Sequence, residues 1–296
     1  MRATGVRSGR GDAVGEPRGL ILPAWAYYVG FFVAPLLFIV AFAFAHREGF
    51  FDITWFSSTE NFRKLWDPVY LKIYGNTLLL AFQGTVGCLL IGYPFAYWIA
   101  TRVRDRKTLV LLLVIVPFWT SILIRTYAWA LILAPSGFVS NGLQDLGLIG
   151  SPLHLLGTNT AVLIGVVYDY LPLMVFPLYV SIERVDRRLV EASRDLGRGR
   201  WATFWRVTAP LTLPGILTGC LLVFVPMTGE YVVPSILGGG LQGLFGPVAA
   251  DQFLDAFNYP FGAAMSLVLV VFLLALIFVY LRVLGRQAER TAGVTL

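Results

Sequence analysis

Three ionisable residues, Arg125, Asp169 and Glu230, lie inside long apolar stretches of this 296-residue chain. Charged side chains are costly inside a membrane, so they usually pair with one another or bind an ion or a substrate. In one interpretation, Arg125 pairs with Asp169 or with Glu230 and only fastens the helices together. In the other, an unpaired carboxylate faces a central path and holds a cation. One base against two acids favours the second interpretation.

Aromatic residues flank both acids, namely Tyr168, Tyr170 and Tyr231. An ammonium ion over such a ring gains about 0.5–2 kcal/mol, so these tyrosines belong to the same candidate substrate path. Around Glu230, Pro226, Gly229 and Pro234 can interrupt the helix, which is tolerated at membrane depth where the backbone lines a cavity or is buried in protein. A plain packing kink is the alternative.

The stretches that carry these residues are long enough to cross a membrane. The chain is 57% hydrophobic and only 14% charged, which leaves too little polar surface for a soluble domain. A spanning helix needs roughly 20 apolar residues. Six such runs occur, at 21–45, 76–101, 108–134, 160–182, 211–236 and 262–285. The predicted fold class is therefore all-α, a polytopic protein with one transmembrane domain over 20–296 and a disordered, Gly- and Arg-rich tail over 1–19.

The distribution of basic residues predicts the orientation. Of the 23 lysines and arginines, 18 lie in the amino-terminal tail, in the links after the second and fourth spans, or at the carboxy terminus. Basic residues accumulate on the cytoplasmic side, so both termini are predicted to be cytoplasmic. The net charge of +6 then follows from topology and does not indicate binding to nucleic acid.

Motifs for bond-breaking chemistry are absent from the sequence. It contains no G-x-x-x-x-G-K-[ST] nucleotide loop, no H-E-x-x-H zinc motif and no G-x-S-x-G nucleophile motif. Cys88 and Cys220 fall inside predicted spans, and His46 and His154 lie in different links, so neither a disulfide nor a metal site is predicted. No residue is therefore assigned as catalytic, and transport or docking is the expected role.

Residues 183–210, which we call the charged loop, contain seven arginines and four acids between positions 183 and 206. Helical spacing places four residues on one face: Leu189, Ala192, Ser193 and Leu196. Gly197 supplies a left-handed helix stop. A second short helix has the same spacing at Trp201, Phe204, Trp205 and Thr208, and Pro210 and Pro214 are expected to end it. The loop could lie on anionic lipid as an amphipathic segment, but the break at Gly197 favours a compact protrusion that docks on a protein.

The stretch EASRDLG, followed after nine residues by VTAP, resembles the E-A-A-x-x-x-G-x(9)-I-x-L-P signature of ATP-binding-cassette importer permeases. Glu191, Ala192, Gly197 and Pro210 match this signature. Ser193, Val207 and Ala209 depart from it. Longer strings resemble the permeases of bacterial spermidine/putrescine importers, among them VPFWTSILIRTYAWALIL, YDYLPLMVFPLYVSIERVDRRLVEASRDLG and GEYVVPSILGG.

The resemblance implies a six-span, type I importer permease fold in the bacterial cytoplasmic membrane. The charged loop would be the coupling helix, which docks on a cytoplasmic ATPase dimer through Leu189, Glu191, Ala192, Ser193, Leu196, Gly197, Trp201, Phe204 and Trp205. ATP and Mg would be bound by that partner and not by this chain. A second homologous permease and an extracytoplasmic solute-binding protein are the other implied partners. Polyamines are the implied cargo, with ferric iron, phosphonates and opines as alternatives.

A secondary transporter or channel is the competing class, with Asp169 and Glu230 as a proton or cation relay. Many such folds contain internal repeats, and none is recognisable in this chain. A membrane-bound enzyme ranks last because the sequence offers no nucleophile with a base.

Overall fold

The computed structural model describes residues 23, 25–47, 53–55, 59–103, 105–239 and 243–292, so the tail predicted over 1–19 lies outside the described residues. Six helical stretches in the described part are long and apolar enough to cross a membrane, at Trp25–Ala43, Pro68–Arg102, Ile122–Asp145, Asn159–Glu183, Arg200–Thr228 and Tyr259–Val283. The prediction of an all-helical, six-span protein is confirmed.

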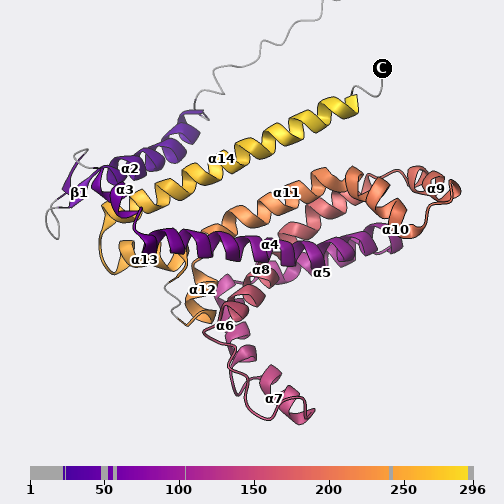
Figure 1. Cartoon of the computed structure of the whole chain (residues 1–296), viewed down its shortest axis with the longest axis horizontal. Helices are drawn as coiled ribbons and strands as arrows, with labels where there is room; N and C mark the ends of the chain where they lie inside the picture. Colours follow the sequence, from indigo (N-terminus) through magenta and orange to yellow (C-terminus); the bar gives the residue numbers. More distant parts are fainter. Residues whose placement is uncertain are drawn as a thin grey trace, which may run out of the picture.

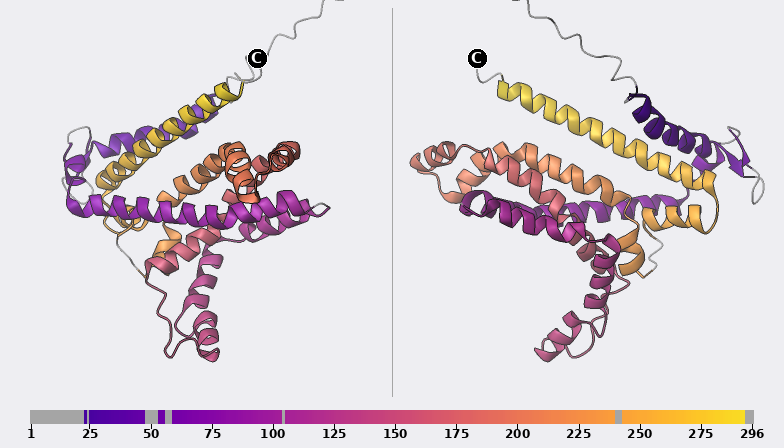
Figure 2. Two further views of the ribbon diagram at one scale, coloured as in Figure 1. Left: turned by 45° about the vertical axis from the view of Figure 1, so that its right-hand side comes forward. Right: turned by 180° about the vertical axis from the view of Figure 1, so that it is seen from behind.

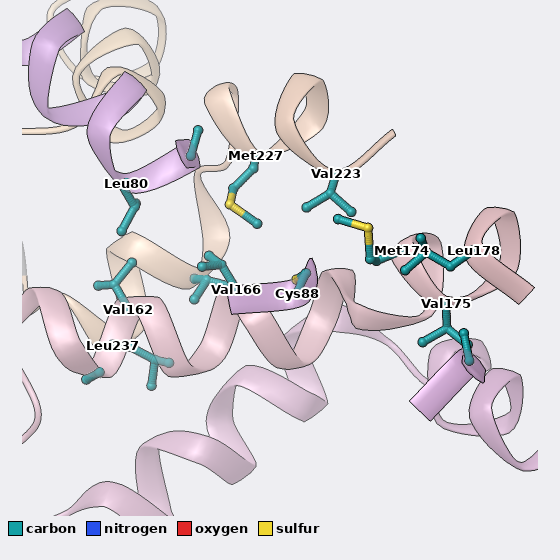
Figure 3. Packing of buried hydrophobic residues seen from close by; sticks show 14 of the residues in the cluster. Leu80, Cys88, Val162, Val166, Met174, Val175, Leu178, Val223, Met227 and Leu237 are labelled. Carbon is teal, nitrogen blue, oxygen red and sulfur yellow. The ribbon is translucent and has the colours of Figure 1, made fainter. Parts of the chain in front are cut away.

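Three long helices form the central bundle: α4 (Pro68–Arg102), α8 (Asn159–Glu183) and α11 (Ala209–Thr228) (Figure 1). Two of them begin at a side-chain cap, since Asp67 accepts a hydrogen bond from the Val69 N–H and Thr158 accepts one from the Ala161 N–H. The short helix α12 (Val232–Leu237) packs on α8. The shared core is apolar and includes Leu80, Cys88, Val166, Met174, Val223, Met227 and Leu237 (Figure 3).

The bundle is tightest where α11 crosses α8. A Cβ atom on Gly215 would lie 2.2 Å from the Ser181 Cβ and 2.7 Å from the Pro177 carbonyl oxygen. Small residues let membrane helices approach closely, and in lipid such packing is a main source of helix association. The two helices therefore form a close joint near the charged loop.

A second layer contains α2 (Ala34–Ala43), extended at its start by the π-helix η1 (Val29–Val33), and α14 (Tyr259–Ala292). These helices lie side by side (Figure 2). The layer joins the central bundle through the Tyr74 hydroxyl, which donates to the Met265 carbonyl oxygen at 2.8 Å. A second contact is the hydrogen bond between the Thr218 and Tyr280 hydroxyls at 2.8 Å.

Short elements connect the two layers at one end of the molecule. The strands β1 (His46–Arg47) and β2 (Ile53–Thr54) pair antiparallel, and α3 (Glu60–Lys64) and α13 (Phe245–Leu254) lie nearby (Figure 1). A hydrogen bond from Lys64, together with its charge, lowers the pKa of Glu60 below its usual value.

The third predicted span, 108–134, is not one continuous helix. It consists of α5 (Lys107–Ile115), the 3₁₀-helix η2 (Val116–Trp119) and α6 (Ile122–Leu133), and α7 (Phe138–Asp145) follows. Pro117 has no N–H to donate to the preceding turn, and the next residues, Thr120 and Ser121, are extended. After this break α6 and α7 lead away from the axis of α4 (Figure 1).

The interruption predicted in the fifth span is confirmed. Helix α11 ends at Thr228, and α12 begins only at Val232. Glu230 therefore lies in a short non-helical link between two apolar helices.

Candidate functional site

The charged loop folds as two helices joined at a glycine. Helix α9 (Arg187–Asp195) begins at Asp186, whose carboxylate accepts a hydrogen bond from the Arg188 N–H at 2.9 Å. Gly197 follows with φ of +82°, a left-handed conformation that residues with a Cβ rarely adopt. Helix α10 (Arg200–Thr203) comes next. The predicted helix–glycine–helix unit is thus present, at one tip of the molecule (Figure 1).

The single apolar face predicted for this loop is divided between two sides. Leu196, Trp201 and Trp205 are 80%, 76% and 66% exposed, and Leu189, Glu191 and Ala192 are exposed with them. Ser193 is buried and its hydroxyl is 3.2 Å from the Thr203 hydroxyl, which joins α9 to α10. Phe204 also turns inward. The loop therefore presents an exposed apolar surface of leucine and tryptophan, while Ser193 and Phe204 make contacts within the protein.

Pro210 and Pro214 were expected to end the second short helix before the fifth span, and this prediction is wrong. Helix α10 continues through the π-helix η3 (Phe204–Thr208) into α11, in one stretch from Arg200 to Thr228. Within it the Ala209 N–H donates to the Phe204 carbonyl oxygen, five residues earlier. Pro210 lies directly after these wider turns and has no N–H to donate to the preceding turn. The exposed loop is therefore a direct extension of a membrane-spanning helix.

The Arg125 side chain forms an ion pair with Asp169. Its Nε lies 2.7 Å from the Asp169 Oδ1, and the two side chains are only 10% and 4% exposed. Its Nη1 donates to the carbonyl oxygens of Pro117, Phe118 and Thr120 at 3.0, 3.2 and 2.7 Å. Arg125 thus supplies donors to carbonyls at the break in the third span, where an unsatisfied backbone group would cost several kcal/mol in lipid.

The ion pair lines a cavity of about 260 Å³ between α4, the break in the third span and α8. Tyr168 contributes to its wall, and its ring meets that of Trp129 edge to face at 5.4 Å. The Arg125 guanidinium lies 5.4 Å from the centre of the Phe118 ring. Apart from the pair, the lining is mostly apolar.

Glu230 has a different environment. Its Oε2 accepts a hydrogen bond from the Tyr170 hydroxyl at 2.5 Å, and its Oε1 accepts from the backbone N–H groups of Val232 and Val233 at 2.9 and 3.3 Å. These two N–H groups open α12, so the carboxylate also interacts favourably with the positive end of that helix. Within the described residues, no lysine, arginine or histidine forms an ion pair with Glu230.

The structure divides the candidate path residues into two groups. Asp169 and Tyr168 face the cavity beside Arg125, while Tyr170 reaches Glu230. Tyr231 is 43% exposed next to Glu230. Sequence reasoning missed Phe118 and Trp129, because neither carries a charge nor lies beside an acid. It also missed the carbonyls that bind Arg125; the signal for them was an arginine eight residues after Pro117.

The model of the family described as "Binding-protein-dependent transport system inner membrane component" matches residues 89–292, which include both acids, Arg125 and the charged loop. The chain belongs to this family. It is therefore a multi-pass inner-membrane permease and a transport subunit, and the importer interpretation prevails over a secondary transporter or an enzyme.

Curated relatives resemble this permease over nearly its full length. It is 41% identical over 268 residues to the spermidine/putrescine transport system permease protein PotB of Haemophilus influenzae, which covers 90% of this chain and 94% of that protein. It is 40% identical over 263 residues to PotB of Escherichia coli K12, with 89% and 96% covered.

Solved structures support the fold. A chain of a bacterial ABC transporter involved in the import of the acidic polysaccharide alginate matches with a TM-score of 0.66 and 18% identity, over 91% of this permease and 94% of that chain. At this level of identity the match supports the type I importer fold and says nothing of cargo.

Proposed function

We propose that this permease is a membrane subunit of an ATP-driven importer of polyamines, with spermidine and putrescine as its cargo. The observation that carries this proposal is the 40–41% identity to the two PotB proteins over about nine-tenths of the chain. The match includes the spans with Arg125, Asp169 and Glu230, so it is not confined to the general features of importer permeases.

In this proposal a separate ATPase dimer binds ATP and Mg, and this chain binds neither. The sequence has no nucleotide-binding loop. The charged loop would dock on the ATPase through its exposed Leu196, Trp201 and Trp205. Tryptophan is one of the residue types most often found as an interface anchor. Docking on a cytoplasmic subunit would put this loop in the cytoplasm and, with six spans, both termini on the same side.

The transport cycle would be alternating access. A solute-binding protein delivers the cargo, and this permease and a second, homologous permease rock around a central path. A solved alginate importer, whose chain matches this one with a TM-score of 0.68 and 18% identity, was determined in complex with a ligand-bound periplasmic protein. This precedent supports a binding protein as a partner of the fold.

Of the two acids in the candidate path, we assign the cargo to Glu230. The charge of Asp169 is balanced by Arg125 at 2.7 Å. Glu230 accepts hydrogen bonds from one hydroxyl and two N–H groups and has no basic partner within the described residues, so an ammonium group of the cargo would be its counter-ion. Tyr170 and Tyr231 lie beside it as possible cation–π partners.

The test begins with the purified complex. The tagged permease should co-purify with an ATPase and a second permease, and in proteoliposomes with the binding protein it should import labelled spermidine when ATP is inside. Putrescine, ferric iron and an organophosphonate serve as competitors. A complex without an ATPase, or uptake without ATP, would overturn the importer mechanism. ATP-driven uptake that only iron or the phosphonate inhibits would leave the importer and overturn the cargo.

A further inference from the structure

Tyr93 of α4 contacts the continuous helix of α10, η3 and α11 at two points. Its ring meets the Phe204 ring edge to face, with centres 5.6 Å apart. Its hydroxyl lies 2.9 Å from the Thr212 hydroxyl, at hydrogen-bond distance. Phe204 is the first residue of the π-helix η3, and Thr212 lies four residues after its end. One side chain of α4 therefore spans the segment that connects the charged loop to the fifth span.

Phe204 and Thr212, the two residues that Tyr93 contacts, each make further contacts. Phe204 also meets the exposed Trp205 and Trp201 edge to face, with ring centres 5.2 and 6.4 Å away. Thr212 is fully buried, and its carbonyl oxygen accepts a hydrogen bond from the Ser181 hydroxyl of α8 at 3.4 Å. A chain of side-chain contacts thus runs from the exposed tryptophans through Phe204 and Tyr93 to Thr212, where α4, α8 and α11 meet.

The charged loop is connected to α11 and to α4 in different ways. A displacement of the loop is transmitted to α11 through the backbone, because α10 and α11 form one helix. The same displacement is transmitted to α4 through side-chain contacts, among them those of Tyr93. Tyr93 lies nine residues before the end of α4 at Arg102, or roughly 14 Å along the helix. Its contacts with Phe204 and Thr212 therefore join α4 to the other helix in the interior of α4 and not at its end.

We propose that Tyr93 is the positioning residue that makes α4 move together with the charged loop, so that movement of the ATPase is passed to α4 as well as to α8 and α11, which the loop joins through the backbone. This inference rests on the proposed function, since it assumes that the charged loop docks on an ATPase. It separates two roles within the loop: Trp201 and Trp205 bind the partner, while Phe204 and Tyr93 transmit the movement to α4.

The experiment measures polyamine uptake per ATP hydrolysed by the reconstituted complex. Tyr93→Phe keeps the ring and removes the hydroxyl, and Thr212→Val removes the other hydroxyl at nearly constant volume. Loss of one such hydrogen bond predicts a fall of about two- to tenfold in uptake per ATP. The double variant should be no worse than the more affected single variant, because both changes remove the same bond. The ATPase should still co-purify in normal amount.

Tyr97→Phe is the matched control, since Tyr97 lies one turn further along α4 and its hydroxyl forms no hydrogen bond within the described part of the chain. Its uptake per ATP should stay at the parental value. Phe204→Leu should lower the ratio and Phe204→Tyr, which keeps the ring, should restore it. Uptake and hydrolysis that fall in equal proportion in Tyr93→Phe would mark a merely structural residue and overturn the proposal, as would an unchanged ratio. Absence of an ATPase from the parental complex would instead refute the proposed function.

Discussion

Replacement of Asp169 by Asn separates a structural ion pair from a cargo site. The asparagine oxygen can still accept a hydrogen bond from the Arg125 Nε, now 2.7 Å from the carboxylate, but it carries no charge. The remaining hydrogen bond still has a charged donor, and such a bond contributes about 1.5–3 kcal/mol, so the variant loses only the attraction between the two opposite charges. Arg125 also keeps its three carbonyl acceptors. We therefore expect Asp169→Asn to cost about 1–2 kcal/mol.

Replacement of Arg125 by Met should be more damaging. It leaves a carboxylate that is 4% exposed without its counter-ion and removes the guanidinium donor from the carbonyl oxygens of Phe118 and Thr120, whereas the Pro117 carbonyl oxygen still accepts from the Thr120 N–H and hydroxyl. Removal of one partner of a buried ion pair typically costs about 3–5 kcal/mol. Arg125→Lys keeps the charge, but one ammonium group lacks the planar fork that reaches the carboxylate and the carbonyls together, so an intermediate loss is expected.

The assay is thermal unfolding of the purified complex, followed beside the apparent uptake constant for spermidine. Each kcal/mol should lower the melting temperature by about 2–4 °C, in the order Arg125→Met, Arg125→Lys, Asp169→Asn, from largest to smallest. The uptake constant of Asp169→Asn should equal that of the parent. A parental melting temperature together with a raised uptake constant would show that Asp169 meets the cargo, and the structural interpretation would be wrong.

Three further variants test other parts of the molecule. Glu230→Gln keeps the acceptor that caps α12 but removes the charge, so the uptake constant for spermidine should rise about tenfold or more, and a parental constant would contradict its role in the path. Gly197→Pro forces φ near −65° where the structure has +82°, so co-purification of the ATPase should be lost while membrane insertion, measured by protease protection, persists. Gly215→Ala would place a Cβ 2.2 Å from the Ser181 Cβ and should lower the melting temperature; Gly75→Ala, with nothing within 4 Å, is the control and should not.

The sequence predicted the features that depend on local chemistry. Six apolar runs were long enough to span a bilayer, Gly197 marked a left-handed stop, and the residues around Glu230 marked an interruption in the fifth span. The last two are present because one residue type at one position favours one backbone conformation. The pairing of Arg125 was narrowed to two acids, and three-dimensional structure was needed to select Asp169.

The break in the third span could not be predicted from the same kind of signal. Pro117 lies in an apolar run, as Pro94 and Pro172 do, yet those two lie inside continuous helices. What distinguishes Pro117 is Arg125, whose side chain folds back to bind the carbonyls at the break. This relation spans eight residues and has no helical period, so a pattern search does not detect it.

The spacing of residues could not predict which way the Phe204 side chain points either. A period of 3.6 residues tells which side chains share a helix face, but not which face meets the protein. The π-helical turns of η3 also change that period, so Phe204 turns toward α4 while Trp201 and Trp205 remain exposed. Sequence analysis could therefore identify the aromatic residues of the charged loop but could not divide them by role.

The counter-ion of Arg125 comes from the next span, and this has a consequence for biogenesis. An arginine at the centre of a lone membrane helix costs about 2.5–3.5 kcal/mol during insertion, and the third span would bear that cost until Asp169 arrives. Release of the third and fourth spans from the translocon as one hairpin avoids it. The ion pair thus gives the third span a counter-ion in lipid that is present only after the fourth span has been made.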